Sequence, residues 1–113
     1  HDALPIYVIG RVNRVLNSGG VKVSLDAIEA LVRAIGGVVE VAALAVNDPE
    51  WGERAALVYV GSPEIADYIA GECLSQLGPA AKPVRVLRVA AIPKLSSGKT
   101  DYLGLASAIA AAG

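Results

Sequence analysis

The spacing of apolar residues changes several times along this chain, and each change marks an expected element of secondary structure. Apolar stretches on both sides of the polar, glycine-containing residues 17–20 predict a β-hairpin near the start. Residues 38–46 and 55–60 are rich in β-branched and other apolar types, which predicts two antiparallel strands joined by a polar loop. Residues 84–89 predict a further strand at a sheet edge, because two arginines interrupt its alternation.

Helical spacing occurs in three stretches. From Ser24 to the glycines at 36–37, apolar residues recur every three or four positions, with charged residues such as Glu29 expected on the outer face. Ser62, followed by proline, predicts the cap of a second helix that ends at residues 78–79. A last helix is expected after a cap at Thr100 or Asp101, with three apolar residues facing inward: Leu105, Ala106 and Ile109.

The order of these elements is hairpin, α, β, β, α, β, α. It predicts a small α+β domain with an N-terminal β-hairpin and a mainly three-stranded sheet covered by helices. The chain has 113 residues, of which 54% are hydrophobic and 19% charged, enough for one modest core and one domain.

Charge and composition exclude several classes of function. The formal net charge is −1 and no cluster of basic residues occurs, so the sequence does not favour binding to nucleic acid or to an anionic membrane. No apolar run is long enough to span a bilayer. The single cysteine, Cys73, fits a reducing compartment such as the cytoplasm.

The sequence offers little for metal binding or thiol chemistry. His1 and Cys73 are the only strong metal ligands, and they do not form a cluster, so we expect no metal site. Cys73 falls within the second expected helix and has no neighbouring histidine to activate it, so we expect it to pack in the core.

The leading candidate for chemistry is Lys99, in the polar stretch PKLSSGKTDY at residues 93–102. An ammonium group on a flexible stem can stabilise negative charge that develops during a reaction. A plain solvated turn is the alternative that this stretch alone leaves open. The segment is not a phosphate-binding P-loop, because Pro93 stands where that motif needs its first glycine and has no N–H to offer phosphate.

A second candidate is the turn formed by residues 17–20. Gly19 and Gly20 can take positive φ and leave backbone exposed, so the turn either only reverses the chain or faces a ligand. Trp51 is the only tryptophan, and anchoring its own loop is favoured over contact with a partner.

Read in order, four segments resemble the C-terminal domain of adenylate-forming enzymes, which include acyl-CoA synthetases, peptide-synthetase adenylation domains and luciferases. Residues 10–20 resemble the hinge motif G-R-x-D-D-x-I-x-x-x-G, and Ile28-Glu29 match the I-E that follows it. Residues 46–53 resemble v-p-D-x-x-x-G-E, and residues 93–99 resemble the closing P-x-x-x-x-G-K. Together these segments cover nearly the whole chain.

The resemblance implies a role for each matching residue. Lys99 bridges the substrate carboxylate and the α-phosphate of ATP during adenylation, and Arg11 lies near the nucleotide. Asn13 is the pivot about which the small domain turns. Ser18, Gly19 and Gly20 line the tunnel for pantetheine during thioester formation, and Lys22 can meet a CoA phosphate, although a solvated lysine is an equal alternative.

Two positions depart from the family pattern. Asn13-Arg14 replaces the usual acidic pair at the hinge, and Tyr102 stands where an arginine commonly follows the G-K-x-D sequence. Neither position carries the proposed chemistry, but the departures bear on the energetics of the hinge and on the exact contacts with the nucleotide.

By the same resemblance, residues 1–9 are the end of a linker from a large N-terminal domain, and residues 10–113 are the lid that closes over it. ATP, CoA and a carboxylic acid are the expected substrates, with Mg²⁺ accompanying ATP, and the isolated lid is expected to be inactive. CoA is expected as acceptor in preference to a carrier protein, since no carrier domain follows.

The form of the loop is similar to o-succinylbenzoate–CoA ligases of menaquinone biosynthesis, with fatty or aryl acid–CoA ligases as the alternative. Two other classes stay open: a stand-alone protein-interaction module and a small ATP-binding protein.

Overall fold

A computed structural model describes residues 14–112 of the chain. Its elements, in order, are β1 (Val15–Ser18), β2 (Val21–Ser24), α1 (Leu25–Arg33), β3 (Val38–Asp48), β4 (Gly52–Gly61), α2 (Ala66–Leu77), the 3-10 turn η1 (Pro79–Ala81), β5 (Arg85–Arg88) and α3 (Tyr102–Ala112). The expected order of hairpin, helix, two strands, helix, strand and helix is confirmed. None of the helices in this part of the chain has the length and apolar character needed to cross a membrane.

The strands within residues 14–112 belong to one five-stranded sheet. Strand β4 lies at its centre, with β3 antiparallel to it on one side as an edge strand, and β5 runs parallel to β4 on the other side along Ala56–Tyr59. The β1–β2 hairpin joins the other end of β4, where Ser18 pairs with Gly52. The α+β class is therefore confirmed, and the hairpin extends the expected three-stranded sheet.

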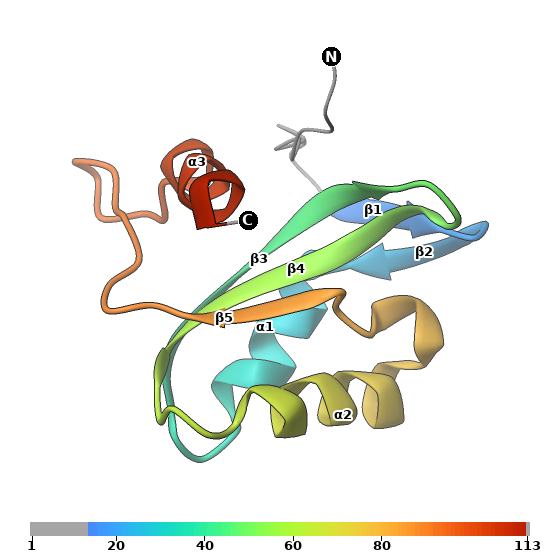
Figure 1. Cartoon of the computed structure of the whole chain (residues 1–113), viewed down its shortest axis with the longest axis horizontal. Helices are drawn as coiled ribbons and strands as arrows, with labels where there is room; N and C mark the ends of the chain where they lie inside the picture. The colour runs from blue at the N-terminus through green and yellow to red at the C-terminus, as the bar shows by residue number, and fades with distance from the viewer. Residues whose placement is uncertain (1–13, 113) are drawn as a thin grey trace.

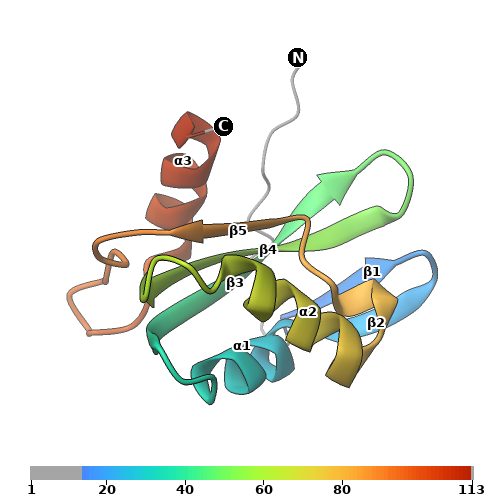
Figure 2. The same ribbon diagram turned by 60° about the horizontal axis from the view of Figure 1, so that its bottom comes forward.

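Helices cover both faces of the sheet. Figures 1 and 2 show α1 and α2 on one face and α3 alone on the other. The buried residues of β3 divide between these faces by strand alternation: Val41, Ala43 and Ala45 belong to the cluster under α1 and α2, while Ala42 and Leu44 belong to the cluster under α3. Burial on both faces explains why this strand reads as one continuous apolar run.

Helix α1 begins as its sequence predicts. The hydroxyl of Ser24 accepts a hydrogen bond from the N–H of Ala27 at 3.0 Å, the usual arrangement of an N-cap. Its apolar face packs on the sheet, but the expectation that Glu29 lies on the outer face is wrong, because this residue is buried. Contacts with other elements make up for its desolvation, as described below.

Two boundaries differ from the sequence prediction. The polar loop expected at residues 47–53 is shorter, because β3 runs to Asp48 and β4 starts at Gly52. The carboxylate of Asp48 accepts the N–H groups of Glu50 and Trp51 at 2.9 and 2.8 Å and so closes a tight turn.

Ser62 does not cap α2, whose first turn follows Ile65 and has no side-chain cap. The N–H of Ser62 bonds instead to the carbonyl of Gly37 at 2.9 Å and closes the end of the β3–β4 pair. Only past this bond does the chain turn into the helix.

Candidate functional site

The segment that carries Lys99 is a narrow loop closed by its own backbone. The N–H of Leu95 bonds to the carbonyl of Lys99 at 2.7 Å, and the N–H of Asp101 bonds to the carbonyl of Pro93 at 2.9 Å. Gly98, with φ +92°, supplies the positive φ that the turn needs and has open space where a Cβ would stand. The backbone therefore fixes where the side chain of Lys99 starts.

Two lysines of this loop differ in their contacts. The ammonium of Lys94 pairs with the carboxylate of Glu40 on β3 at 2.9 Å, which ties the first part of the loop to the sheet. Lys99 is exposed, and its ammonium has no ion-pair or hydrogen-bond partner among the residues that the structure describes. The predicted catalytic lysine is thus free to meet a charge from outside this part of the chain.

The far side of the loop is held by the start of α3. One oxygen of Asp101 accepts the N–H of Gly104 at 2.9 Å, so the expected cap at this position is confirmed. A Cβ at Gly104 would stand 2.6 Å from the other oxygen of Asp101, so a larger residue there would displace this carboxylate.

The second candidate loop, the β1–β2 turn, exposes backbone. Gly19 and Gly20 have φ of +58° and +86° and are both exposed. A Cβ on Gly19 would lie 2.9 Å from the indole ring of Trp51. The backbone N–H of Gly19 donates a hydrogen bond to the backbone carbonyl of Trp51 at 2.7 Å. Trp51 therefore anchors its own turn to the hairpin, and glycine at 19 is required by this packing as well as by φ.

The other residues predicted at this turn differ in exposure. Ser18 is fully buried, and its hydroxyl has no hydrogen-bond partner among the described residues. Lys22 is exposed, with its ammonium 3.4 Å from the side-chain oxygen of Asn17. Solvent therefore reaches the two glycines and Lys22 but not Ser18.

A polar cleft of about 430 Å³ lies between α2, β4 and the segment that leads into β5. Three cationic side chains line it, Arg54, Lys82 and Arg85, with Asp67 as the single acid. Arg54 lies over the ring of Trp51 at 5.1 Å, and its Nε is buried without a partner among the described residues. These cations are scattered in the sequence, so only the fold could reveal the cleft.

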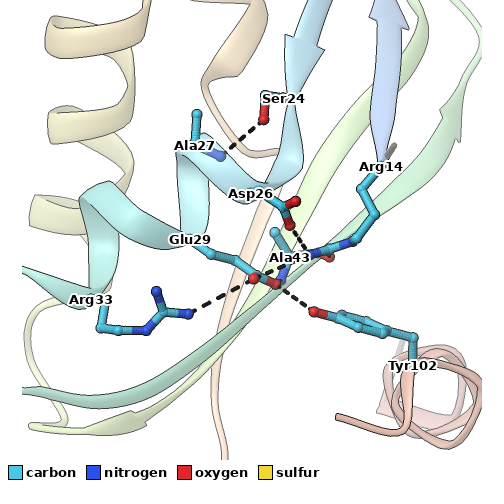
Figure 3. Close-up of polar contacts among 8 residues, drawn as sticks. All are labelled: Arg14, Ser24, Asp26, Ala27, Glu29, Arg33, Ala43 and Tyr102. Atoms are coloured by element: carbon cyan, nitrogen blue, oxygen red, sulfur yellow. Dashed lines mark hydrogen bonds and ion pairs between the residues drawn. The ribbon is translucent and has the colours of Figure 1, made fainter. Parts of the chain in front are cut away.

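A cluster of charged groups joins the start of β1 to α1, β3 and α3 (Figure 3). The guanidinium of Arg14 lies 2.7 Å from the carboxylate of Asp26 and 3.1 Å from that of Glu29, donates to the carbonyl of Ala43, and lies 4.3 Å from the ring centre of Tyr102. The hydroxyl of Tyr102 donates to Glu29 at 2.9 Å. Sequence reasoning missed this cluster because its members are far apart in the chain.

The cluster shifts the pKa values of its members. Burial and then the negative charge of Glu29 raise the pKa of Tyr102 to about 12. Burial on its own lowers the pKa of Arg14, but the hydrogen bond and the charge attraction to Glu29 outweigh it, so the pKa is raised. At neutral pH the tyrosine is therefore a neutral donor and the arginine a cation.

The two candidate loops are not brought together. In Figures 1 and 2 the β1–β2 turn and the segment between β5 and α3 lie at opposite ends of the molecule. Arg11, Asn13 and the expected linker 1–9 lie outside the described residues.

Residues 27–99 match the family described as the AMP-binding enzyme C-terminal domain. The chain belongs to this family. The match spans most of the fold and ends at Lys99.

Known members of the family differ in substrate. A medium/long-chain-fatty-acid–[acyl-carrier-protein] ligase of Mycobacterium tuberculosis is 29% identical over 93% of this chain and 21% of its own length. A salicylyl-CoA synthase/salicylate adenylyltransferase of a Streptomyces species is 32% identical over 89% of this chain and 19% of its own length. This chain therefore spans about a fifth of the length of the curated relatives it matches.

A solved double mutant of o-succinylbenzoate CoA synthetase from Bacillus subtilis superposes with a TM-score of 0.72. The aligned region covers 83% of this chain and 20% of the Bacillus subtilis chain, and the two sequences are 22% identical there. At this level of identity the likeness concerns the fold alone.

Proposed function

We propose that this chain is the C-terminal lid of an AMP-forming acid–CoA ligase. The observation that carries the proposal is the exposed Lys99, whose ammonium has no partner among residues 14–112 and whose loop is tied to the sheet on one side and to α3 on the other. Such a lysine suits a pocket supplied by another part of the protein. In this reading residues 10–113 form the lid and residues 1–9 end the linker from a large N-terminal domain.

In the first half-reaction, a carboxylate oxygen of the acid attacks the α-phosphorus of ATP, an acyl-adenylate forms, and pyrophosphate leaves. Two anions must approach each other, and negative charge grows on the phosphate oxygens as the new bond forms. The ammonium of Lys99 donates hydrogen bonds to these oxygens and offsets the repulsion. Arg11 would contact the nucleotide, and Asn13 would act as the pivot.

In the second half-reaction, a thiol attacks the acyl carbonyl and AMP leaves. A turn that presents Gly20 lets a thiol-bearing chain pass close to backbone, because no atom lies within 4 Å of the place where a Cβ would stand, while the indole of Trp51 packs on Gly19 beside it. Rotation about the pivot would exchange the two ends of the domain between these steps.

CoA is our proposed thiol acceptor. The cleft lined by Arg54, Lys82 and Arg85 supports a phosphate-bearing acceptor, and the ammonium of Lys22 adds a further cation near the turn. The fatty-acid relative, however, is named for a carrier-protein acceptor, which makes that the alternative.

Two proposals can be made for the carboxylic acid substrate. The loop sequence S-G-G-V-x-V favours o-succinylbenzoate, which would place the enzyme in menaquinone biosynthesis. The curated relatives act on fatty and aryl acids by name, and this supports the alternative of a fatty or aryl acid.

Mg²⁺ is expected to accompany ATP, and a cytoplasmic enzyme is the proposed setting. Among residues 14–112, no three His, Cys, Asp or Glu side chains are grouped to hold a metal ion.

The test uses the full-length protein that contains this lid. ATP–pyrophosphate exchange is measured with decanoate, benzoate and o-succinylbenzoate, for the unmodified enzyme and for Lys99→Ala. We expect exchange with at least one acid, reduced about 100- to 1000-fold by Lys99→Ala. Lys94→Ala removes the other lysine of the loop, whose charge is paired with Glu40, and it should lower exchange less than Lys99→Ala does. Exchange that Lys99→Ala leaves at the normal rate would contradict the proposal.

A further inference from the structure

The cluster around Glu29 is built as a junction between segments that are distant in sequence. Glu29 comes from α1, Arg14 from the residue before β1, and Tyr102 from the first position of α3, as Figure 3 shows. The carboxylate of Glu29 also accepts the N–H of Ala43 on β3 at 2.8 Å. One buried carboxylate therefore holds three other parts of the domain.

The junction is nearly complete in its hydrogen bonding. One oxygen of Glu29 faces Arg14 at 3.1 Å and, more distantly, Arg33 at 3.9 Å. The other oxygen accepts from the backbone of Ala43 and from the hydroxyl of Tyr102. A buried carboxylate with these partners fixes their geometry, because any displacement leaves a desolvated charge unpaired.

Tyr102 connects this junction to the loop that carries Lys99. It follows Lys99 by three residues and directly follows Asp101, the cap whose N–H closes the loop on Pro93. On the other side of the loop, Lys94 is paired with Glu40. The Tyr102 hydroxyl thus supplies the second fixed point of the loop that presents Lys99.

Arg14 connects the same junction to the proposed pivot at residue 13. Its backbone has φ +48°, a left-handed conformation that a non-glycine residue adopts at a cost. Its carbonyl accepts the N–H of Leu25 at 2.9 Å, and its guanidinium is held by Asp26 and Glu29. The first described residue after the pivot is therefore fixed to α1.

We propose that Glu29 and Tyr102 are positioning residues for Lys99. They join its loop rigidly to Arg14, so that rotation at the pivot carries the ammonium to the reacting phosphate as part of one body. This inference rests on the proposed function. It assigns the two residues to adenylation only, because Lys99 leaves the reaction centre when the opposite end of the domain is presented.

The test is Tyr102→Phe in the full-length enzyme, which removes one hydroxyl and keeps the ring beside Arg14. The acid is the member of the decanoate, benzoate and o-succinylbenzoate panel that gives the fastest exchange. We expect kcat for pyrophosphate exchange to fall about tenfold, with KM for ATP within about twofold. Thioester formation from the synthetic acyl-adenylate and CoA should stay within about twofold.

Two further variants make the result specific. In a Lys99→Ala background, Tyr102→Phe should cost no more than about twofold, because a residue that acts through Lys99 has nothing left to position. Tyr68→Phe is the matched control, since this tyrosine on α2 is exposed and its hydroxyl has no partner among the described residues. Glu29→Gln is the second probe, and it should lower adenylation at least as much as Tyr102→Phe.

The outcomes separate this inference from the proposed function. If Lys99→Ala lowers exchange but Tyr102→Phe and Glu29→Gln do not, the positioning role is overturned and the function stands. Equal losses in both half-reactions, or a tenfold loss that persists without Lys99, would show a structural role only and would also overturn it. If Lys99→Ala itself leaves exchange unchanged, both proposals fail.

Discussion

The two ends of this domain expose different kinds of group. At one end a closed loop presents the side chain of Lys99, whose ammonium has no partner among the described residues. At the other end, Gly19 and Gly20 present backbone without a side chain. The difference fits two chemical demands, since anions that must meet need a cation, whereas a narrow thiol-bearing chain needs room.

The two ends are also held in place by different forces. The Lys99 loop is closed by its own backbone but is tied to the rest of the domain by side-chain contacts, the Lys94–Glu40 pair and the hydrogen bond from Tyr102 to Glu29. The β1–β2 turn depends on backbone pairing and on the indole of Trp51 packed against Gly19. Changes at one end should therefore leave the other end in place.

The largest effect is expected from breaking the junction that holds the Lys99 end. Arg14→Ala leaves the buried carboxylate of Glu29 without its main cation and should lower the free energy of unfolding by about 3–5 kcal/mol. Arg33→Ala is the control, because this arginine is exposed and 3.9 Å from Glu29, and it should cost less than about 1 kcal/mol. Urea unfolding of the two variants measures the difference, and equal losses would contradict a buried role for Arg14.

The next effect concerns the glycine turn. Gly19→Ala places a methyl group against Trp51 in a positive-φ conformation and should slow thioester formation about 10- to 100-fold, with pyrophosphate exchange nearly unchanged. Gly20→Ala also introduces a side chain at positive φ, +86°, but it meets no atom within 4 Å, so its effect should be milder. Rates of the two half-reactions in the full-length enzyme test this, and a larger loss for Gly20→Ala would show that packing on Trp51 is irrelevant.

The smallest effect is a pH dependence of stability at the Lys99 end. The pKa of Tyr102 is about 12 in the folded chain against an ordinary value of 10.0, so folding retains the phenol proton. The stability that this contributes is fully present below pH 10 and is lost as pH rises toward 12. Tyr102→Phe should therefore lose less stability than the unmodified chain between these pH values.

Ionisation of Cys73 also lowers stability as the pH rises, both in the unmodified chain and in Tyr102→Phe. Its pKa is raised from 9.0 to about 11 by burial and by the charge of Glu72, so only the difference between the two unfolding curves reports on Tyr102. Parallel curves from pH 10 to 12 would contradict the burial of its hydroxyl.

The parts of the fold that were predictable from sequence depend on neighbouring residues. Ser24 caps α1 and Asp101 caps α3 because a cap needs only a short polar side chain and a following helix. Ser62 failed as a cap because its N–H is engaged by Gly37, a contact across the end of the sheet that local sequence does not specify.

The candidate site shows the same division. Lys99 and the glycines of the turn stand out in the sequence because their motifs are contiguous. The burial of Glu29 could not be seen in the sequence, because its partners lie 73 residues away at Tyr102 and 14 residues away at Ala43. A charged residue in a helical pattern looks exposed until the fold supplies its partners.

The most direct test of the account is whether the two half-reactions separate at the two ends. In the full-length enzyme, Lys99→Ala is assayed for pyrophosphate exchange and, separately, for thioester formation from synthetic acyl-adenylate and CoA. We expect exchange to fall about 100- to 1000-fold while thioester formation stays within about twofold. An equal loss in both reactions, or no loss in exchange, would contradict the account.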